Sequence, residues 1–269
     1  MKLMKKKTTK LILSASILII FLLIVTVLST GHSNTHQGIN YNIAANATTP
    51  IKKPDFANIK DVKEKKQAFI SYMSAAINNA NKEICAEKIE LKKLTTSFQK
   101  SKKLDSTQQE KLEKYIEYYK IKDVHTTQEQ LDLLDIKIGV APTSFILAQA
   151  ILESGWGSSR FARDYSNYFG LHCFKDGCGA KASGANVYLE TFPNATQSVL
   201  GYYNRLNTGT KFKDFREVRQ KVELGKLPAT ELLNTLTDYS ELEGDEYKIR
   251  LESVISHNKL DQYDNIKIC

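Results

Sequence analysis

Apolar residues follow two patterns along this chain, and each predicts a different kind of segment. Residues 11–28, LILSASILIIFLLIVTVL, are mostly apolar and carry no charge. Their length is close to the minimum for a membrane-spanning helix and exceeds the usual apolar core of a signal peptide. Residues 31–54 are polar and non-periodic, which is typical of a flexible linker. From residue 55 onward, apolar positions recur at helical spacing.

The highly charged segment 55–124 is predicted to form a helical arm. It contains no glycine, because none occurs between Gly38 and Gly139, and this agrees with long helices. We expect the arm either to pack on the main domain or to offer a surface to a protein partner. Its apolar stripes consist of Phe69, Ile70, Met73, Ala76, Ile77, Ile84, Ile89, Leu91 and Leu94, then Leu112, Tyr115, Ile116 and Tyr119.

Residues 125–269 are predicted to form the main domain. A helix over 126–138 opens in the style of a capping box. The next helix starts near Pro142, stops at Gly155 and is apolar nearly all round, so we expect it to be central and buried. Residues 185–191 alternate like half of a small hairpin. Further helices are expected over 158–165, from Asn194 to about 206, and over 212–224, 230–239 and 247–259. Long strands between helices are missing, which disfavours a doubly wound α/β fold.

The positive charge of the chain is concentrated at its start. The net charge is +8, and five lysines with no acid occur in the first ten residues. Lysines before an apolar stretch predict an N-terminus inside the cell and the remainder outside. We therefore expect residues 1–30 to be a signal anchor in the inner membrane, with the catalytic domain in the periplasm. Secretion after signal cleavage near residues 44–47 is the alternative. No other basic run with aromatics occurs, so nucleic acid is not an expected partner.

The four cysteines agree with an extracytoplasmic location, because an even number in an exported chain suggests two disulfides. Cys173 and Cys178 flank a loop short enough to close with a bridge. Cys85 and Cys269 remain, and spacing alone does not prove their pairing. A zinc site built from His172, Cys173 and Cys178 lacks a fourth ligand, so no metal or other cofactor is expected.

Glu153 is the strongest candidate for a catalytic residue. It is the only carboxylate of the apolar helix, at the helix end, where the dipole disfavours an anion and a structural role is poorly motivated. Partial desolvation favours the neutral form of such a carboxyl. A carboxyl that stays neutral near pH 7 can give a proton to a leaving oxygen, which is the general-acid step of glycoside cleavage.

Aromatic and amide side chains near Glu153 are candidates for binding a sugar. Trp156, the only tryptophan, presents a face of the kind that packs on pyranose rings. Asn167, Tyr168 and Phe169 follow in a turn and are candidates for the floor of a cleft. Packing in the core is the alternative for Trp156 and for Phe169.

Two further residues are candidates for the chemistry itself. Tyr239 lies near a helix end, where its phenol is suited to orient a water or steady a sugar, with core packing as the alternative. Glu190, in the strand-like segment, is the obvious partner carboxylate for Glu153. An exposed strand face is the alternative for Glu190.

Residues 147–157, LAQAILESGWG, resemble the N-acetylglucosaminidase domains of glycoside hydrolase family 73. The longer pattern is similar to one branch, the bacterial Bax-like proteins, and spans roughly residues 58–260. Several separated motifs carry it in order: SNYFG at 166–170, CFKDGC at 173–178, YLETF at 188–192, LGYYNRLNT at 200–208, FREVR at 215–219 and YSE at 239–241.

The resemblance implies a mainly α, lysozyme-like fold with a small β-hairpin and a cleft for a peptidoglycan strand. It implies hydrolysis of a β-1,4 bond on the N-acetylglucosamine side. Glu153 matches the family's general acid and Tyr239 its tyrosine near the cleft. The second glutamate of the family does not map cleanly, and Glu190 is the nearest match. Related domains also act on other glycans or are described as amidases.

Three continuations follow protonation by Glu153. A distant carboxylate such as Glu190 activates a water, or the substrate's N-acetyl group attacks, or a sugar hydroxyl attacks as in lytic transglycosylases. None of them requires a metal. The leading hypothesis is therefore a membrane-tethered endo-β-N-acetylglucosaminidase of the cell wall. The alternatives are a muramidase or lytic transglycosylase, and a non-catalytic glycan-binding scaffold.

Overall fold

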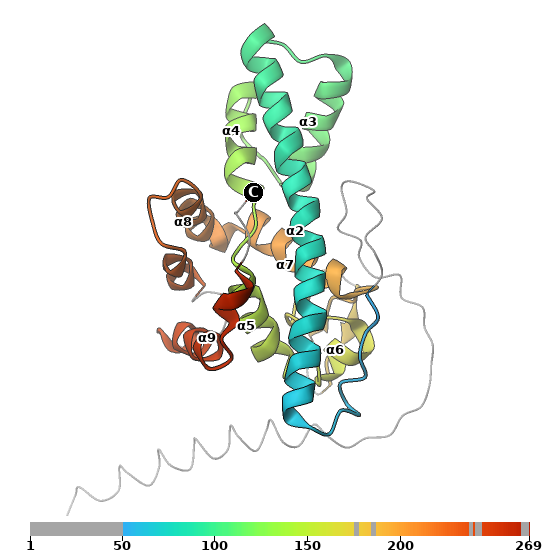
Figure 1. Ribbon diagram of the computed structural model, residues 1–269. Coiled ribbons are helices and arrows are strands. Elements are labelled where there is room, and N and C mark those ends of the chain that lie inside the picture. Colours follow the sequence, from blue (N-terminus) through green and yellow to red (C-terminus); the bar gives the residue numbers. More distant parts are fainter. Residues whose placement is uncertain (1–50, 175–177, 184–186, 237–238, 240–243, 265–268) are drawn as a thin grey trace, which may run out of the picture.

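The computed structural model describes residues 51–174, 178–183, 187–236, 239, 244–264 and 269 of this chain (Figure 1). Within those residues no helix combines the length and apolar character needed to cross a membrane. The predicted anchor over residues 11–28, and the linker up to residue 50, lie outside the described residues.

One long helix, α2 (Val62–Ser101), spans most of the height of the molecule (Figure 1). It begins at Asp61, whose side chain accepts a hydrogen bond from the Glu64 amide, and ends at Lys102 in a left-handed conformation. Two shorter helices, α3 (Ser106–Tyr118) and α4 (Thr127–Lys137), lie beside its second half. The predicted start of α4 is confirmed, because Thr126 accepts from the Glu129 amide as its N-cap.

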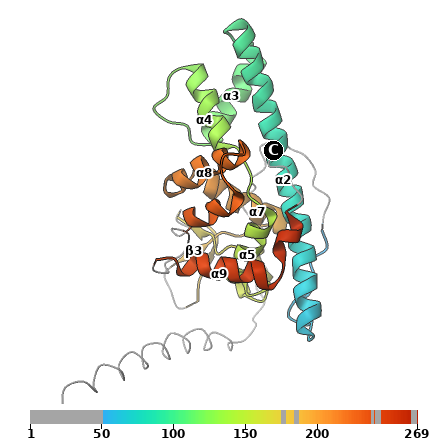
Figure 2. The same cartoon turned by 60° about the vertical axis from the view of Figure 1, so that its left-hand side comes forward.

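The predicted central helix is α5 (Thr143–Ser154), which ends at Gly155 as expected. It packs against α2 and α9 (Glu246–His257), which Figure 2 shows beside it. The other helices are α6 (Arg160–Tyr165), α7 (Ala195–Thr208) and α8 (Lys213–Glu223), with short 3-10 helices η1 (Thr210–Phe212), η2 (Ala229–Thr235) and η4 (Leu260–Tyr263). The described chain is thus mainly helical, as predicted.

The segment predicted as a helix over 230–239 differs from expectation. The structure has the 3-10 helix η2 there, with Leu232 and Leu233 as its buried side chains. Leu236, directly after η2, is buried as well, three and four residues beyond these two, so the apolar spacing expected of a helix is present although the backbone is a 3-10 helix.

The predicted half-hairpin is the centre of a small antiparallel sheet. Strands β1 (His172–Cys173), β3 (Tyr188–Leu189) and β2 (Ala180–Lys181) lie side by side in that order. Gly179, with a φ of +65°, precedes β2, and a Cβ atom there would lie 1.9 Å from the Leu189 carbonyl oxygen. Only glycine fits such a close approach of two backbones.

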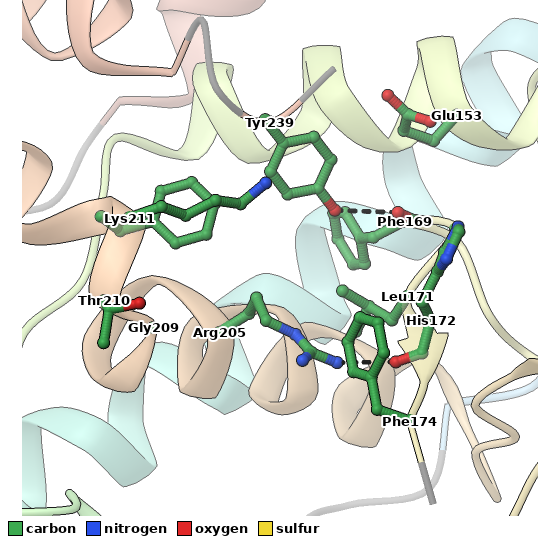
Figure 3. Close-up of a pocket in the computed structure, with 12 residues that line it drawn as sticks. Glu153, Phe169, Leu171, His172, Phe174, Arg205, Gly209, Thr210, Lys211 and Tyr239 are labelled. Carbon is green, nitrogen blue, oxygen red and sulfur yellow. Dashed lines mark hydrogen bonds between the residues drawn. The ribbon is translucent and has the colours of Figure 1, made fainter. Parts of the chain in front are cut away.

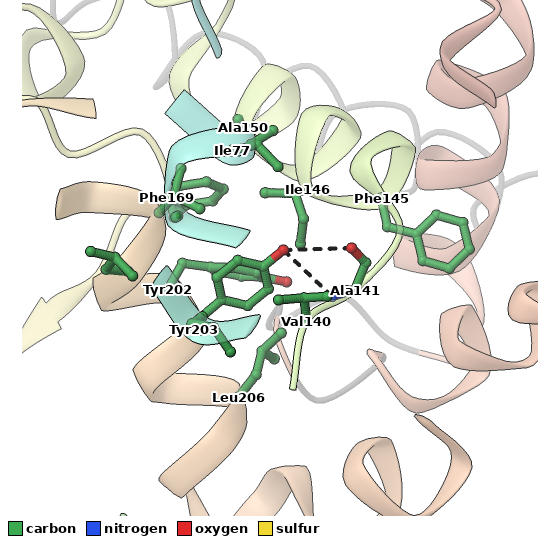
Figure 4. Close-up of a cluster of buried hydrophobic side chains, with 14 of the residues drawn as sticks. Ile77, Val140, Ala141, Phe145, Ile146, Ala150, Phe169, Tyr202, Tyr203 and Leu206 are labelled. Atoms are coloured by element: carbon green, nitrogen blue, oxygen red, sulfur yellow. Dashed lines mark hydrogen bonds between the residues drawn. The ribbon is translucent and has the colours of Figure 1, made fainter. Parts of the chain in front are cut away.

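A single core joins the arm to the main domain. Figure 4 shows Ile77 of α2 beside Ile146 and Ala150 of α5. Tyr203 of α7 donates a hydrogen bond to Oδ1 of Asn81 in α2 (2.7 Å). The arm therefore packs on the main domain, the first of its two predicted roles, and the core is continuous across the predicted boundary at residues 124 and 125.

Both expected disulfides are present. Cys173–Cys178 closes the loop after β1, as predicted. Cys85–Cys269 joins α2 to a residue 184 positions away. This second pairing was not predictable from spacing.

Candidate active site

An unusual turn places Glu153 at the end of α5. Gly155, Trp156 and Gly157 all have left-handed φ angles, of 56°, 58° and 74°. Ser154 holds this turn, because its hydroxyl accepts from the Gly157 amide (2.9 Å) and donates to the Ala150 carbonyl. The chain therefore turns away directly after the helix and leaves the Glu153 carboxyl at a surface.

That surface is a pocket of about 760 Å³ (Figure 3). Apolar and cationic groups surround the single carboxylate in its lining. The lining residues are Glu153, Phe169, Gly170, Leu171, His172, Phe174, Arg205, Gly209, Thr210, Lys211, Phe212 and Tyr239.

The two oxygens of the Glu153 carboxyl have different neighbours. Oε1 accepts a hydrogen bond from the Tyr247 hydroxyl of α9 (3.1 Å). Oε2 faces Gly170, where an added Cβ atom would lie 3.6 Å away. The residue stays accessible from the pocket, but the protein packed around the carboxyl raises its pKa, and the bond from Tyr247 partly offsets this. Glu153 thus has the raised pKa that a general acid requires.

Tyr239 lies beside this carboxyl in the pocket (Figure 3). Its hydroxyl donates to the Phe169 carbonyl (2.8 Å), and its ring stacks on that of Tyr247 with centroids 6.0 Å apart. Burial raises the pKa of Tyr239 well above its ordinary value, and the nearby charge of Glu153 adds to the effect. The phenol is therefore protonated at physiological pH.

The opposite wall of the pocket carries an exposed aromatic ring. Phe174, next to the Cys173–Cys178 disulfide, is 81% exposed. The guanidinium of Arg205 lies 5.3 Å from the centre of its ring. Arg205 itself donates to the His172 carbonyl and to Oε1 of Glu190, each at 2.9 Å. Glu190 is buried, and the pocket lining does not include it.

Of the predicted site residues, Glu153, Phe169 and Tyr239 line the pocket together. Asn167 and Tyr168, expected in the cleft floor, are buried and are not among the residues that line the pocket. The Asn167 amide donates to the carbonyls of Leu171 and Glu190 (3.0 Å each), so it joins the backbones around β1 and β3.

Trp156, expected in the cleft, is directed toward α2 instead. Its ring lies 5.8 Å from that of Phe69, and the Lys66 ammonium lies 4.9 Å from its ring centre. Tyr168 packs on the same helix, 6.0 Å from the ring of Tyr72. These two aromatics therefore attach α2 to the domain, because the left-handed turn after Ser154 rotates Trp156 away from the pocket.

Sequence reasoning did not find Phe174, Arg205, Tyr247 or Gln149. Gln149 had a readable signal: it is the one amide of an apolar helix, and it lies four residues before Glu153 on the same face. A buried amide needs partners. Phe174 and Arg205 gave no signal, because nothing in their spacing showed that they meet.

The described part of the chain contains no group of three or more His, Cys, Asp or Glu side chains able to hold a metal ion. Cys173 and Cys178 are joined to each other, so neither is a thiolate ligand in this structure.

Comparisons with known proteins assign the class. The Glucosaminidase family, described as mannosyl-glycoprotein endo-beta-N-acetylglucosaminidase, matches residues 128–260, which include every residue that lines the pocket. The chain is thus a glucosaminidase-domain protein.

Similarity to one bacterial protein indicates which branch of this class the chain belongs to. Protein bax of Escherichia coli (strain K12) is 28% identical over 198 residues, covering 72% of this chain and 70% of that protein. The chain belongs to the Bax-like bacterial glucosaminidase-domain proteins. The catalytic domain of the autolysin Auto from Listeria monocytogenes aligns with a TM-score of 0.36 and 18% identity, over 60% of this chain and 90% of that one.

Proposed function

We propose that this protein is an endo-β-N-acetylglucosaminidase that cleaves β-1,4 bonds in the glycan strands of peptidoglycan, with Glu153 as general acid. The observation that carries the proposal is the Glu153 carboxyl, which faces a pocket and has its pKa raised by the surrounding protein. The match to the Glucosaminidase family supports the same reaction class. The proposal includes a lysozyme-like fold around the cleft.

In the first step, protonated Glu153 gives its proton to the glycosidic oxygen. The bond from this oxygen to the anomeric carbon breaks, and the leaving sugar keeps the proton as a hydroxyl. Positive charge then develops at the anomeric carbon and the ring oxygen. The Glu153 carboxylate formed in this step lies on the same side and stabilises that charge.

For the second step we favour attack by the substrate's own N-acetyl oxygen. Glu190 is buried and bound to Arg205, which is a poor arrangement for activating a water in the pocket. This attack forms a ring between the N-acetyl oxygen and the anomeric carbon. Water then attacks the anomeric carbon and opens that ring, and Glu153 takes the proton that the water releases, which restores the acid. Glu190 in this scheme is a positioning residue that holds Arg205 beside Phe174.

We also propose that the protein acts outside the cytoplasmic membrane, anchored through residues 11–28. The apolar character of that segment and the five preceding lysines support this location. The two disulfides support an oxidising compartment.

Mass spectrometry of digested peptidoglycan tests the reaction. The full-length chain in detergent micelles and its Glu153→Gln variant are each incubated with purified peptidoglycan, and the new chain ends are reduced with borohydride. We expect reduced N-acetylglucosamine ends with the wild type and at least a hundredfold fewer with the variant. Reduced muramic ends would identify a muramidase, and anhydro-muramoyl ends a lytic transglycosylase. Intact strands that bind both proteins would favour the scaffold.

The Glu190→Gln variant separates the two mechanisms. A water-activating base contributes on the order of 10²–10⁴ to the rate, so its loss would lower kcat by that factor. If Glu190 only positions Arg205, glutamine can still accept the bond from Arg205. Because glutamine lacks the negative charge that holds Arg205, KM rises in this case, while kcat changes only a few-fold.

A further inference from the structure

A chain of buried hydrogen bonds leads from the core of the domain to the Glu153 carboxyl. The Tyr202 hydroxyl of α7 donates to Oε1 of Gln149. The Gln149 amide nitrogen donates to the Tyr247 hydroxyl (3.1 Å), and this hydroxyl donates to Oε1 of Glu153 (3.1 Å). Tyr202 and Gln149 have no exposed surface, and Tyr247 is 2% exposed. We call Tyr202, Gln149 and Tyr247 the hydrogen-bond chain.

Tyr202, at the fully buried end of the hydrogen-bond chain, determines which group donates and which accepts in each bond. Within the described structure, the Tyr202 hydroxyl has one acceptor, the Gln149 carbonyl oxygen. A buried hydroxyl proton needs an acceptor, so the Gln149 amide must turn its oxygen to Tyr202 and its nitrogen to Tyr247. The Tyr247 oxygen thereby accepts a hydrogen bond from Gln149, so the Tyr247 hydroxyl must donate its own hydrogen bond elsewhere, to Glu153.

This direction makes the two carboxyl oxygens of Glu153 unequal. Oε1 accepts the hydrogen bond from Tyr247, so it is the less favoured of the two oxygens to carry the acid proton. Oε2 is the oxygen that faces Gly170 on the pocket wall, where the absence of a side chain leaves it open.

We propose that Tyr202, Gln149 and Tyr247 are positioning residues that direct the Tyr247 proton onto Oε1 of Glu153 and so reserve Oε2 as the oxygen that carries the acid proton into the pocket. The catalytic part of this inference rests on the proposed function. The bond from Tyr247 also favours the ionised carboxyl, in opposition to the surrounding protein. The hydrogen-bond chain therefore limits how far the pKa of Glu153 rises.

The other polar groups near Glu153 do not duplicate this effect. The Tyr239 hydroxyl donates to the Phe169 carbonyl. Arg205 of α7 is held by Glu190 and the His172 carbonyl. The His172 ring and Lys211 line the same pocket, and Tyr247 is the one group in the described structure with a hydrogen bond to the carboxyl.

The test is a direct titration of Glu153 in the full-length protein, which needs no substrate. Carbon-13 NMR follows the side-chain carboxyls of glutamate-labelled protein, and Glu153→Gln assigns the signal. Tyr247→Phe removes the donor, so we expect the titration midpoint to move to higher pH by about one unit. Tyr202→Phe leaves Tyr247 in place but frees the Gln149 amide to turn its oxygen toward Tyr247. We expect a smaller shift in the same direction.

Tyr203→Phe is the matched control. It removes a buried hydroxyl from the next residue of α7, which bonds to Asn81 and contacts no member of the hydrogen-bond chain through its hydroxyl. We expect its Glu153 midpoint to equal that of the wild type. Near-UV circular dichroism confirms that each variant is folded.

A wild-type midpoint in both Tyr202→Phe and Tyr247→Phe would overturn the proposal. A shifted titration midpoint in Tyr247→Phe but not in Tyr202→Phe would overturn the role of Tyr202 and Gln149. In the active enzyme, the alkaline limb of kcat/KM should move with the NMR midpoint. If the wild type cleaves no glycan, the proposed function fails while the NMR result still decides the hydrogen-bond chain.

Discussion

Removing the Cys85–Cys269 disulfide is the perturbation whose size the structure defines best. The two cysteines are 184 positions apart, and the bridge connects the middle of α2 to the far end of the described chain. A crosslink stabilises a protein chiefly by limiting the unfolded chain, and the gain grows with the logarithm of the loop length. A loop of this size corresponds to about 5 kcal/mol of unfolding free energy at 25 °C.

The second disulfide provides an internal comparison. Cys173 and Cys178 are only five positions apart, which corresponds to about 2 kcal/mol. All four cysteines are partly exposed, so replacement by serine has a similar local cost at each position. The Cys85→Ser, Cys269→Ser pair should therefore lose about 3 kcal/mol more than the Cys173→Ser, Cys178→Ser pair.

Urea unfolding of the full-length variants measures this difference. Trp156 is the only tryptophan, and it lies between α2 and α5, so its fluorescence reports the separation of these helices. Linear extrapolation gives the free energies, provided the slopes agree among variants. A loss from the long-range pair that is equal to or smaller than the loss from the short-range pair would refute the chain-entropy argument.

Three further changes test other parts of the structure. If the exposed Phe174 ring packs on a sugar, as the proposed function implies, it should stabilise ground state and transition state alike, so Phe174→Ala should raise KM several-fold with little change in kcat. Steady-state kinetics on peptidoglycan fragments would contradict this if kcat fell instead. Gly157→Ala should lower the unfolding free energy by more than about 1 kcal/mol in urea titration, since its φ is +74° and the new Cβ would lie 2.7 Å from Phe56. Glu87 is buried, which raises its pKa to about 7, so the folded state binds the proton more tightly than the unfolded state. The stability that the protonated Glu87 contributes is fully present below the pKa of the unfolded state and is lost as pH rises to about 7. Glu87→Gln should therefore make the free energy of unfolding depend less on pH, as thermal melts between pH 5 and 8 would show.

Local sequence signals predicted the helices well, because helix boundaries depend on neighbouring residues. Thr126, Asn194 and Gly155 cap their helices at the expected places. The position of Glu153 at an accessible helix end was predictable for the same reason, since the turn that exposes it is encoded in the four residues after it. The location of residues 11–28 remains a prediction, because the described chain begins after them.

The sugar-binding candidates depended on contacts between distant segments. Whether Trp156 faces the pocket or the core is decided by α2, about 90 residues earlier in the chain. The same holds for Tyr168, which α2 covers. No periodicity within the local motif records the position of that helix, so it could not separate Trp156 and Tyr168, which pack on α2, from Phe169, which lines the pocket.

Motifs shared with a family can also be structural. The FREVR segment contains Arg219, which is buried and donates to the carbonyls of Ile136 and Lys137 (2.9 Å each). These carbonyls lie at the C-terminal end of α4, where backbone oxygens lack partners within the helix. The motif therefore joins α8 to α4, and it lies outside the pocket lining.

The architecture links the packing of the core to the orientation of the Glu153 carboxyl. Gln149 and Glu153 lie on one face of α5, four residues apart, and that face passes from the fully buried core to the pocket. An apolar residue at Gln149 would suit the helix but leave the buried hydroxyl of Tyr202 without an acceptor and that of Tyr247 without its donor. The polar groups along this face are thus required as a set, because each one satisfies the next. A central helix that is otherwise apolar can in this way carry one carboxyl with a defined orientation at its end.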